Sequence, residues 1–186
     1  TMLMPGTDGN VSMEAYLTSK SEFIKVTFRL IQDEDGYPPA SYESVWLKRN
    51  SNGEYELDNI PLYIYGVSKG DVITFQKSND EYVVSGIAKR KGHSTLRIYM
   101  NEAQQKENVI SALQSLGGHI GTSASAALFS LDIPSDIPFL RIDAFLKSKY
   151  DDGILDYEDA CLQHGDIDPI RVSECESVFN IVCTTP

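Results

Sequence analysis

The sequence predicts an α+β protein in which an N-terminal all-β unit packs against a C-terminal α/β unit. Up to about residue 92, short segments of alternating apolar and polar residues recur with turns roughly every 8–12 positions, as in small bent sheets and barrels. Beyond that point, apolar residues at helical spacing alternate with strand-like segments. The predicted units are residues 13–92 and residues 93–186.

The first predicted strand covers residues 22–31, where apolar residues from Ile24 to Leu30 occupy every second position. This two-residue period is typical of a strand with one buried face. Residues 33–39 end the strand, because one glycine and two prolines favour a loop there.

The following segments are joined by short turns. Residues 43–48 and 54–59 flank a polar turn that ends at Gly53, which predicts a hairpin. Two more strands are predicted at residues 72–76 and 81–89. Strands this short, with turns this close together, predict a small bent antiparallel sheet or a barrel.

The second unit begins with a predicted strand at residues 94–100, whose apolar residues again occupy every second position. Asn101 is expected to cap the next helix, because its side chain can accept a hydrogen bond from a free backbone N–H. Apolar residues then recur at helical spacing up to Leu116, and Gly117-Gly118 is expected to end that helix.

A strand at residues 128–133 and a helix at residues 136–149 are predicted next. Residues 156–163 are predicted to form a short third helix, and residues 178–183 a strand that returns to the sheet. The order β-α-β-β-α-β, with one extra helix, is that of a ferredoxin-like α/β plait.

Negative charge is concentrated at the end of the chain. The net charge is −11, and residues 151–186 contain nine acidic residues and one basic residue. Such a field attracts basic proteins and repels nucleic acid. We therefore expect a basic protein as partner, and neither nucleic acid nor a membrane. The predicted contact residues are Tyr150, Asp151, Asp152, Asp156, Tyr157, Glu158, Asp159, Asp166 and Asp168.

The densest basic run, residues 89–97, predicts an alternative ligand site at His93, Ser94 and Arg97, with the loop at residues 33–37 closing over it. Neighbours along a strand face opposite sides, so His93 is not expected to activate Ser94, and no catalytic residue is assigned. A solvated turn, or ion pairs between this run and the acidic end of the chain, is the competing interpretation.

No metal or cofactor site is predicted. Cys161, Cys175 and Cys183 lack the C-x-x-C spacing of zinc sites, and an odd number of cysteines favours a reduced, cytoplasmic compartment. No apolar run approaches the roughly 18 residues that a membrane helix needs. Tyr63 and Tyr65 are interpreted as packing residues.

Six segments occur in a recognisable order. They are residues 33–39 (DEDGYPP), 43–46 (ESVW), 57–61 (LDNIP), 66–71 (GVSKGD), 92–97 (GHSTLR) and 156–162 (DYEDACL). Together they resemble an uncharacterised family of small bacterial domains of unknown function, over roughly residues 22–164. The family carries no assigned reaction, so the resemblance implies only a bacterial, soluble, stand-alone protein.

Small acidic bacterial proteins without a catalytic set are often immunity proteins of toxin systems. By this analogy, the sequence predicts a non-enzymatic protein that neutralises a cationic, nuclease-type toxin domain. Complementary charge would raise the association rate, and a few buried aromatic anchors would supply most of the affinity. Two alternatives stay open: an enzyme or ligand sensor that uses residues 93–97, and an acidic segment that only keeps the protein soluble.

Overall fold

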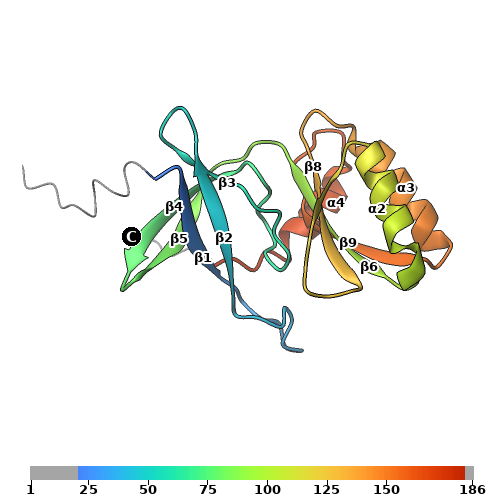
Figure 1. The fold of residues 1–186 in the computed structure, drawn as a ribbon, viewed down its shortest axis with the longest axis horizontal. Helices are drawn as coiled ribbons and strands as arrows, with labels where there is room; N and C mark the ends of the chain where they lie inside the picture. The colour runs from blue at the N-terminus through green and yellow to red at the C-terminus, as the bar shows by residue number, and fades with distance from the viewer. Residues whose placement is uncertain (1–20, 183–186) are drawn as a thin grey trace, which may run out of the picture.

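The computed structural model describes residues 21–182, in which two β-sheet units lie side by side and three α-helices pack on the second unit (Figure 1). Residues 13–20 of the predicted first unit, and Cys183, lie outside the described residues. None of the helices in the described range is long and apolar enough to cross a membrane.

The first unit is a closed barrel with the strand order β1-β2-β3-β4-β5. Its strands are β1 (Phe23–Arg29), β2 (Tyr42–Arg49), β3 (Tyr55–Leu57), β4 (Val72–Ser78) and β5 (Glu81–Lys89). Successive strands pair antiparallel, and β5 closes the barrel by meeting β1 in parallel. Val26 and Phe28 of β1 fill its interior, as the two-residue period predicts. The prediction of a small bent sheet or barrel is confirmed.

The second unit is a four-stranded sheet with the order β7-β8-β6-β9, in which all neighbours are antiparallel. Its strands are β6 (Ser94–Met100), β7 (His119–Gly121), β8 (Leu128–Ile133) and β9 (Leu155–Cys161). A 3-10 turn, η1 (Ala103–Gln105), and the helix α2 (Lys106–Ser115) connect β6 to β7. The helix α3 (Phe139–Asp151) connects β8 to β9, and α4 (Pro169–Glu176) follows β9. The α+β class is therefore confirmed.

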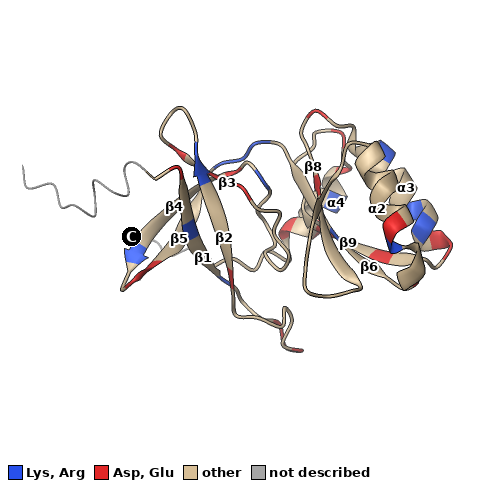
Figure 2. Cartoon of the chain, viewed as in Figure 1, with Lys and Arg blue, Asp and Glu red and all other residues tan. Residues whose placement is uncertain are grey.

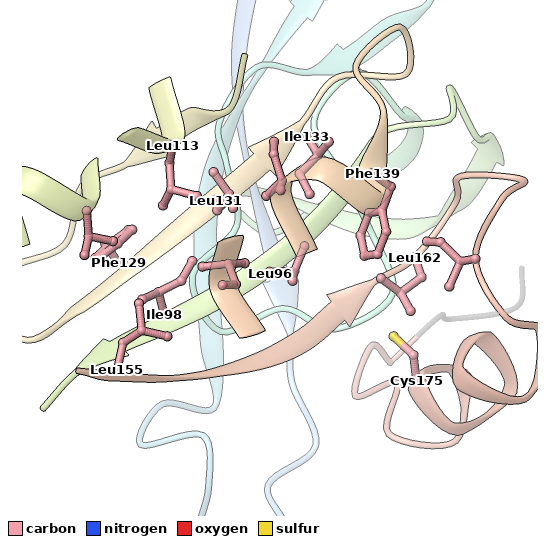
Figure 3. Close-up of a cluster of buried hydrophobic side chains, with 14 of the residues drawn as sticks. Leu96, Ile98, Leu113, Phe129, Leu131, Ile133, Phe139, Leu155, Leu162 and Cys175 are labelled. Atoms are coloured by element: carbon pink, nitrogen blue, oxygen red, sulfur yellow. The ribbon is translucent and has the colours of Figure 1, made fainter. Parts of the chain in front are cut away.

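The helices cover one face of this sheet, and the hydrophobic core of the second unit lies between the helices and the sheet (Figure 3). Leu96 and Ile98 of β6 and Leu131 of β8 point toward Leu113 of α2 and Phe139 of α3, and all five are fully buried. Each large apolar side chain buried in this way contributes about 1.5–3 kcal/mol. This burial holds α2 and α3 on the sheet and leaves its other face for the barrel.

The opposite face of the sheet is polar and packs against the barrel unit through the segment between β3 and β4. Thr95 donates a hydrogen bond to Ser68 over 2.8 Å, and the backbone N–H of Gly66 donates to the carbonyl of Ala160 over 2.8 Å. Buried polar groups need partners of this kind, since an unpaired one costs about 1–3 kcal/mol. The interface between the two units is therefore held by hydrogen bonds as well as by packing.

The predicted helix at residues 156–163 is wrong, because this segment forms β9. It pairs with β6 from Leu155, opposite Met100, to Cys161, opposite Thr95. The spacing of Tyr157 and Cys161 suggested one face of a helix, but in β9 they pair with Ile98 and Thr95, which lie on opposite faces of β6. Pairing with β6 therefore made this segment a strand.

The predicted strand at residues 178–183 is also wrong for the part that is described. Ile181 forms an isolated bridge with Leu30 at the end of β1, so this segment returns to the barrel and not to the second sheet. The helix α4, which was not predicted, precedes it and is capped by Asp168. Asn101 likewise caps no helix: Gln105 precedes α2, and the Asn101 side chain donates to Asp156.

Candidate functional site

A pocket of about 470 Å³ opens where two loops of the barrel unit meet the second sheet. This volume lies within the range of roughly 300–1,000 Å³ that small-molecule sites occupy. Its wall is mostly aromatic and apolar, and is formed by Tyr37, Pro39, Tyr63, Tyr99 and Leu128. The remaining residues that line it are Arg97, Ser125, Asp156, Tyr157 and Glu158.

The pairing of β6 with β9 places the charged residues of the pocket. Arg97 lies directly opposite Glu158, and the next pair on the same face is Tyr99 opposite Asp156. Residues opposite each other in an antiparallel pair have Cβ atoms about 4.5–5.5 Å apart. One guanidinium and two carboxylates therefore share one patch of the sheet.

Arg97 lies at the base of this patch and is only 1% exposed. Its Cζ atom lies 3.8 Å from the ring centroid of Tyr65, which is a close cation–π contact. Its Nη1 donates to the hydroxyl of Tyr37 over 3.2 Å, and its Nε lies 3.4 Å from Glu158 Oε1. Within residues 21–182, neither Nε nor Nη2 makes a hydrogen bond.

Glu158 links the two tyrosines to this arginine. Its Oε1 accepts from the hydroxyl of Tyr65 over 3.1 Å and, more weakly, from that of Tyr37 over 3.5 Å. Burial raises the pKa of Tyr65 well above its usual value, so its hydroxyl stays protonated and remains a donor. These contacts use one oxygen of the carboxylate, whose side chain is 47% exposed and lines the pocket.

Asp156 is the second carboxylate at the pocket and is exposed. One of its oxygens, Oδ2, accepts from the side-chain amide of Asn101 over 3.0 Å. Both acids can therefore offer an oxygen to a ligand. Tyr157 borders the pocket, and its hydroxyl lies 3.4 Å from Asp143 on α3.

The pocket joins residues from both sites that the sequence predicted. Asp156, Tyr157 and Glu158 come from the predicted partner-contact set, and Arg97 comes from the alternative ligand site. Tyr37, the last residue of the loop at residues 33–37, contacts Arg97 through its hydroxyl. His93 and Ser94, however, do not line this pocket, and each belongs to a different cluster of side chains.

His93 belongs to a separate cluster with Asp132 and His119. Its Nδ1 lies 2.8 Å from Asp132 Oδ1, and His119 Nδ1 lies 3.3 Å from Oδ2 of the same buried carboxylate. The hydrogen bond to Asp132 raises the pKa of His93 above its usual value. A carboxylate that orients an imidazole is common in enzymes, but neither histidine lines the pocket described above.

Ser94 is fully buried and contacts His164, not His93. Its Oγ lies 2.7 Å from His164 Nδ1, while His164 Nε2 lies 3.1 Å from the carbonyl oxygen of Pro134. Because that carbonyl can only accept, Nε2 carries the proton, and Nδ1 accepts from the serine. Ser94 Oγ also accepts from the backbone N–H of Gln163. This arrangement ties β6 to the segment after β9.

The acidic residues of the predicted contact set do not form one surface (Figure 2). Asp159 points to the helices, where Arg171 forms paired hydrogen bonds with it and with Asp143. Asp168 caps α4, and Asp151 pairs with Lys147 on the surface. The others in the set that are exposed are Asp152 and Asp166 near the helices and Asp156 and Glu158 at the pocket.

Tyr150 is the most exposed aromatic residue of the predicted contact set. Its side chain is 52% exposed at the end of α3, and its ring meets that of Tyr157 edge to face. It precedes Asp151 and Asp152, which are both exposed. We call these three residues the acidic corner, in which the Tyr150 ring lies next to two exposed carboxylates.

The basic run at residues 89–91 does not pair with the acidic end of the chain. Lys89 contacts Glu54, Arg90 lies 3.8 Å from the buried Asp71, and Lys91 lies 3.5 Å from Glu56. All these acids belong to the barrel unit. The interpretation that the basic run pairs with the acidic end is therefore wrong for residues 89–91, whereas Arg97 of the same run does contact Glu158.

No group of three or more His, Cys, Asp or Glu in the described range is placed to hold a metal ion. Cys161 and Cys175 are both free and buried. Burial raises the pKa of both thiols, that of Cys175 to about 12, so neither is a reactive thiolate at neutral pH.

Residues 43–157 match the domain of unknown function DUF4265, and this span is more than half of the chain. The chain belongs to the DUF4265 family. The predicted resemblance to an uncharacterised domain family is thus confirmed. No curated protein sequence is similar enough to this DUF4265 chain to be matched with it.

The fold of this DUF4265 chain is similar to that of a hypothetical protein from Neisseria gonorrhoeae, known from a crystal structure. The two share 17% sequence identity, with a TM-score of 0.63. The similarity covers 76% of this chain and 98% of the other. At this identity the likeness concerns the fold alone.

Sequence reasoning missed the tyrosines of the DUF4265 pocket. Tyr63 and Tyr65 were interpreted as packing residues, and Tyr63 does pack against the barrel core while Tyr65 is buried. What this interpretation missed is that Tyr63 also lines the pocket and Tyr65 also stacks on Arg97. Tyr99 is exposed on the same face as Arg97, two positions along β6. An arginine between Leu96 and Ile98 in a strand was the available signal, because a charge at such a position needs a partner from outside the strand.

Proposed function

We propose that this chain is a binding protein whose pocket accepts the positively charged group of an amphipathic organic ligand. One observation carries this proposal: Asp156 and Glu158 open on a pocket whose other walls are mostly tyrosine rings, a proline and a leucine. Such a lining suits a ligand with an apolar body and a cationic head.

The charges of the pocket favour a cation over an anion. Two carboxylates outweigh the one guanidinium, which is covered and lies beside Glu158. A cation would gain hydrogen bonds to the free carboxylate oxygens and attraction to the faces of the tyrosine rings, each worth roughly 1–3 kcal/mol in a partly desolvated site. The surplus of acids over bases in the whole chain acts in the same direction.

The proposal is for binding rather than turnover. The Ser94–His164 contact, which has the composition of a catalytic pair, lies outside the pocket, and its serine is fully buried. The two free, buried cysteines agree with the proposed cytoplasmic location. We also propose that the second unit is a ferredoxin-like plait, a proposal supported by its element order and by the antiparallel strand order β7-β8-β6-β9.

Calorimetric titration with three probes of one shape tests the cation proposal. We expect 2-phenylethylamine to bind, and the neutral 2-phenylethanol and the anionic 3-phenylpropionate to bind at least about 10-fold more weakly. Asp156→Asn should weaken binding of the amine by roughly 10-fold, whereas Asp151→Asn, an exposed acid outside the pocket, should leave it unchanged. Equal binding of the amine and the alcohol would reject the proposal.

A second proposal is that the chain binds a basic protein, as an immunity protein that neutralises a cationic, nuclease-type toxin domain. The observation that favours it is the acidic corner at the end of α3, where exposed Tyr150 precedes exposed Asp151 and Asp152. An aromatic anchor rimmed by acids suits a basic protein surface. The test is protection of cells from the toxin encoded next to this gene: Tyr150→Ala should abolish it, and Tyr42→Ala, which removes an exposed tyrosine of the barrel, should not.

A further inference from the structure

The guanidinium of Arg97 is the most unusual polar group of the described chain. It is almost fully buried, yet two of its three nitrogens make no hydrogen bond among the described residues. A buried charged donor that is left without an acceptor is more costly than a neutral one. Arg97 also lines the pocket. An acceptor supplied by a ligand would remove this cost.

The group that covers Arg97 is held weakly. The Tyr37 hydroxyl is 3.2 Å from Nη1, at the upper end of the usual range for N–H···O, and 3.5 Å from Glu158 Oε1, which is long for a hydrogen bond of a hydroxyl. The Tyr37 side chain is 38% exposed. A ligand oxygen can therefore replace the Tyr37 hydroxyl without disturbing the core.

A second pocket gives the displaced ring a place to go. It has a volume of about 350 Å³ and is lined by Tyr37 and Tyr65, together with Val178 and Phe179 after α4. Tyr37 thus forms part of the wall of both pockets. Movement of its ring toward the second pocket would open the path from the first pocket to Arg97.

We infer that the ligand of this pocket is a free α-amino acid with an apolar side chain, whose carboxylate binds Arg97 and whose ammonium binds Asp156 and Glu158. This inference rests on the cation-binding function proposed above and adds the anionic half of the ligand. The planar guanidinium fork matches a carboxylate, with which it forms paired hydrogen bonds.

The spacing of the charged residues fits such a ligand. Arg97 and Asp156 belong to neighbouring cross-strand pairs on one face, which are separated by two residues along the strands, or about 6.8 Å. Diagonal neighbours of this kind lie about 7–8 Å apart, so long side chains at both positions can reach one small ligand that carries opposite charges on adjacent atoms. The tyrosines and Leu128 would then enclose the apolar side chain.

The position of Glu158 leaves one side of Arg97 open to a carboxylate. Glu158 Oε1 lies on the Nε side of Arg97, so a ligand carboxylate would approach through Nη2 and avoid that oxygen. A zwitterion adds no net charge to the pocket, and it gives the buried Nη2 an acceptor that a simple amine would not supply.

Titration of the full chain with three matched compounds tests the inference. We expect L-phenylalanine to bind about 10-fold more tightly than its methyl ester, which keeps the ammonium and lacks the carboxylate. N-acetyl-phenylalanine, which lacks the cation, should bind at least about 10-fold more weakly than L-phenylalanine. Tyr37→Phe, which removes the covering hydroxyl, should tighten binding of the amino acid several-fold and leave that of the ester unchanged.

The outcomes separate this inference from the function on which it rests. If the ester binds as tightly as the amino acid, the inference is wrong and the cation pocket stands. The same conclusion follows if Tyr37→Phe changes both affinities equally. If neither the amino acid nor the ester binds, both the inference and the cation pocket fail.

Discussion

The guanidinium of Arg97 stacks on the ring of Tyr65, with Cζ 3.8 Å from the ring centroid. Arg97 belongs to the second sheet and Tyr65 to the segment between β3 and β4 of the barrel unit, so this contact crosses the interface. The Tyr65 hydroxyl continues the contact to Glu158 on β9. One tyrosine therefore contacts both Arg97 and Glu158, and its loss should affect stability as well as binding.

Two substitutions at Tyr65 separate stacking from hydrogen bonding. Tyr65→Phe keeps the ring and removes only the hydroxyl, which should cost about 1 kcal/mol of unfolding free energy. Tyr65→Leu also removes the ring from Arg97 and should cost about 3 kcal/mol. Urea denaturation measures both values. Equal losses for the two variants would show that the stacked ring contributes nothing beyond apolar volume.

His93 should make stability depend on pH. Its pKa is raised in the folded state by the hydrogen bond to Asp132, so the folded protein holds this proton more tightly than the unfolded chain does. The resulting stabilisation is complete below the unfolded pKa of about 6.5 and is lost as pH rises through the raised folded pKa. His93→Gln should therefore destabilise the protein more at pH 5.5 than at pH 9.

The measurement is urea denaturation of the wild type and of His93→Gln at both pH values. His119→Gln is the control, because His119 approaches the other oxygen of Asp132 at 3.3 Å and remains more than half exposed. If the loss of unfolding free energy caused by His93→Gln does not change with pH, the hydrogen bond to Asp132 does not raise the pKa of His93 in the folded protein.

Arg171 should contribute far more to the free energy of unfolding than an ordinary surface cation does. It forms paired hydrogen bonds of 2.7–2.9 Å with both Asp143 on α3 and Asp159 on β9, and so fastens α4 to both. Arg171→Ala would leave two partly buried carboxylates facing each other without a cation, which should cost about 2–3 kcal/mol. Lys147→Ala, which breaks the exposed pair with Asp151, should cost at most about 0.5 kcal/mol. Similar losses in chemical denaturation would contradict this difference.

Two glycines with positive φ angles should respond differently to alanine. Gly153 has a φ of 74° and open space around it, so Gly153→Ala should cost only the strain of the left-handed conformation, about 1 kcal/mol. Gly66 has a φ of 93°, and a Cβ there would lie 2.7 Å from the ring of Phe179. Gly66→Ala should therefore cost at least about 3 kcal/mol. Thermal unfolding of both variants checks the order.

Regular periodicity predicted the elements that have one apolar face. β1 alternates and became a barrel strand, and the spacing up to Leu116 became α2, which ends before Gly117. β9 was missed because the spacing of Tyr157, Ala160 and Cys161 suggested one face of a helix. Pairing with β6 overrode that local signal. α4 was missed because it spans only eight residues and buries one of them, Cys175, so the apolar period is too short to be recognised.

The candidate site was predicted in fragments. Arg97 and the acids at positions 156 and 158 were each singled out, but as rival sites. Arg97 is far along the chain from these acids, and no local sequence pattern predicts that they face each other. The register of β6 against β9 brings them together.

The sequence by itself determined the class of the protein, its family, its charge and most of its strands and helices, because these follow from composition, motifs and local periodicity. Only the tertiary structure decided that Arg97 lies between Tyr65 and Glu158 at the base of a pocket. The physical reason is that a buried charge is stabilised by partners from other elements. Which partners it meets depends on strand register and on how the two units dock.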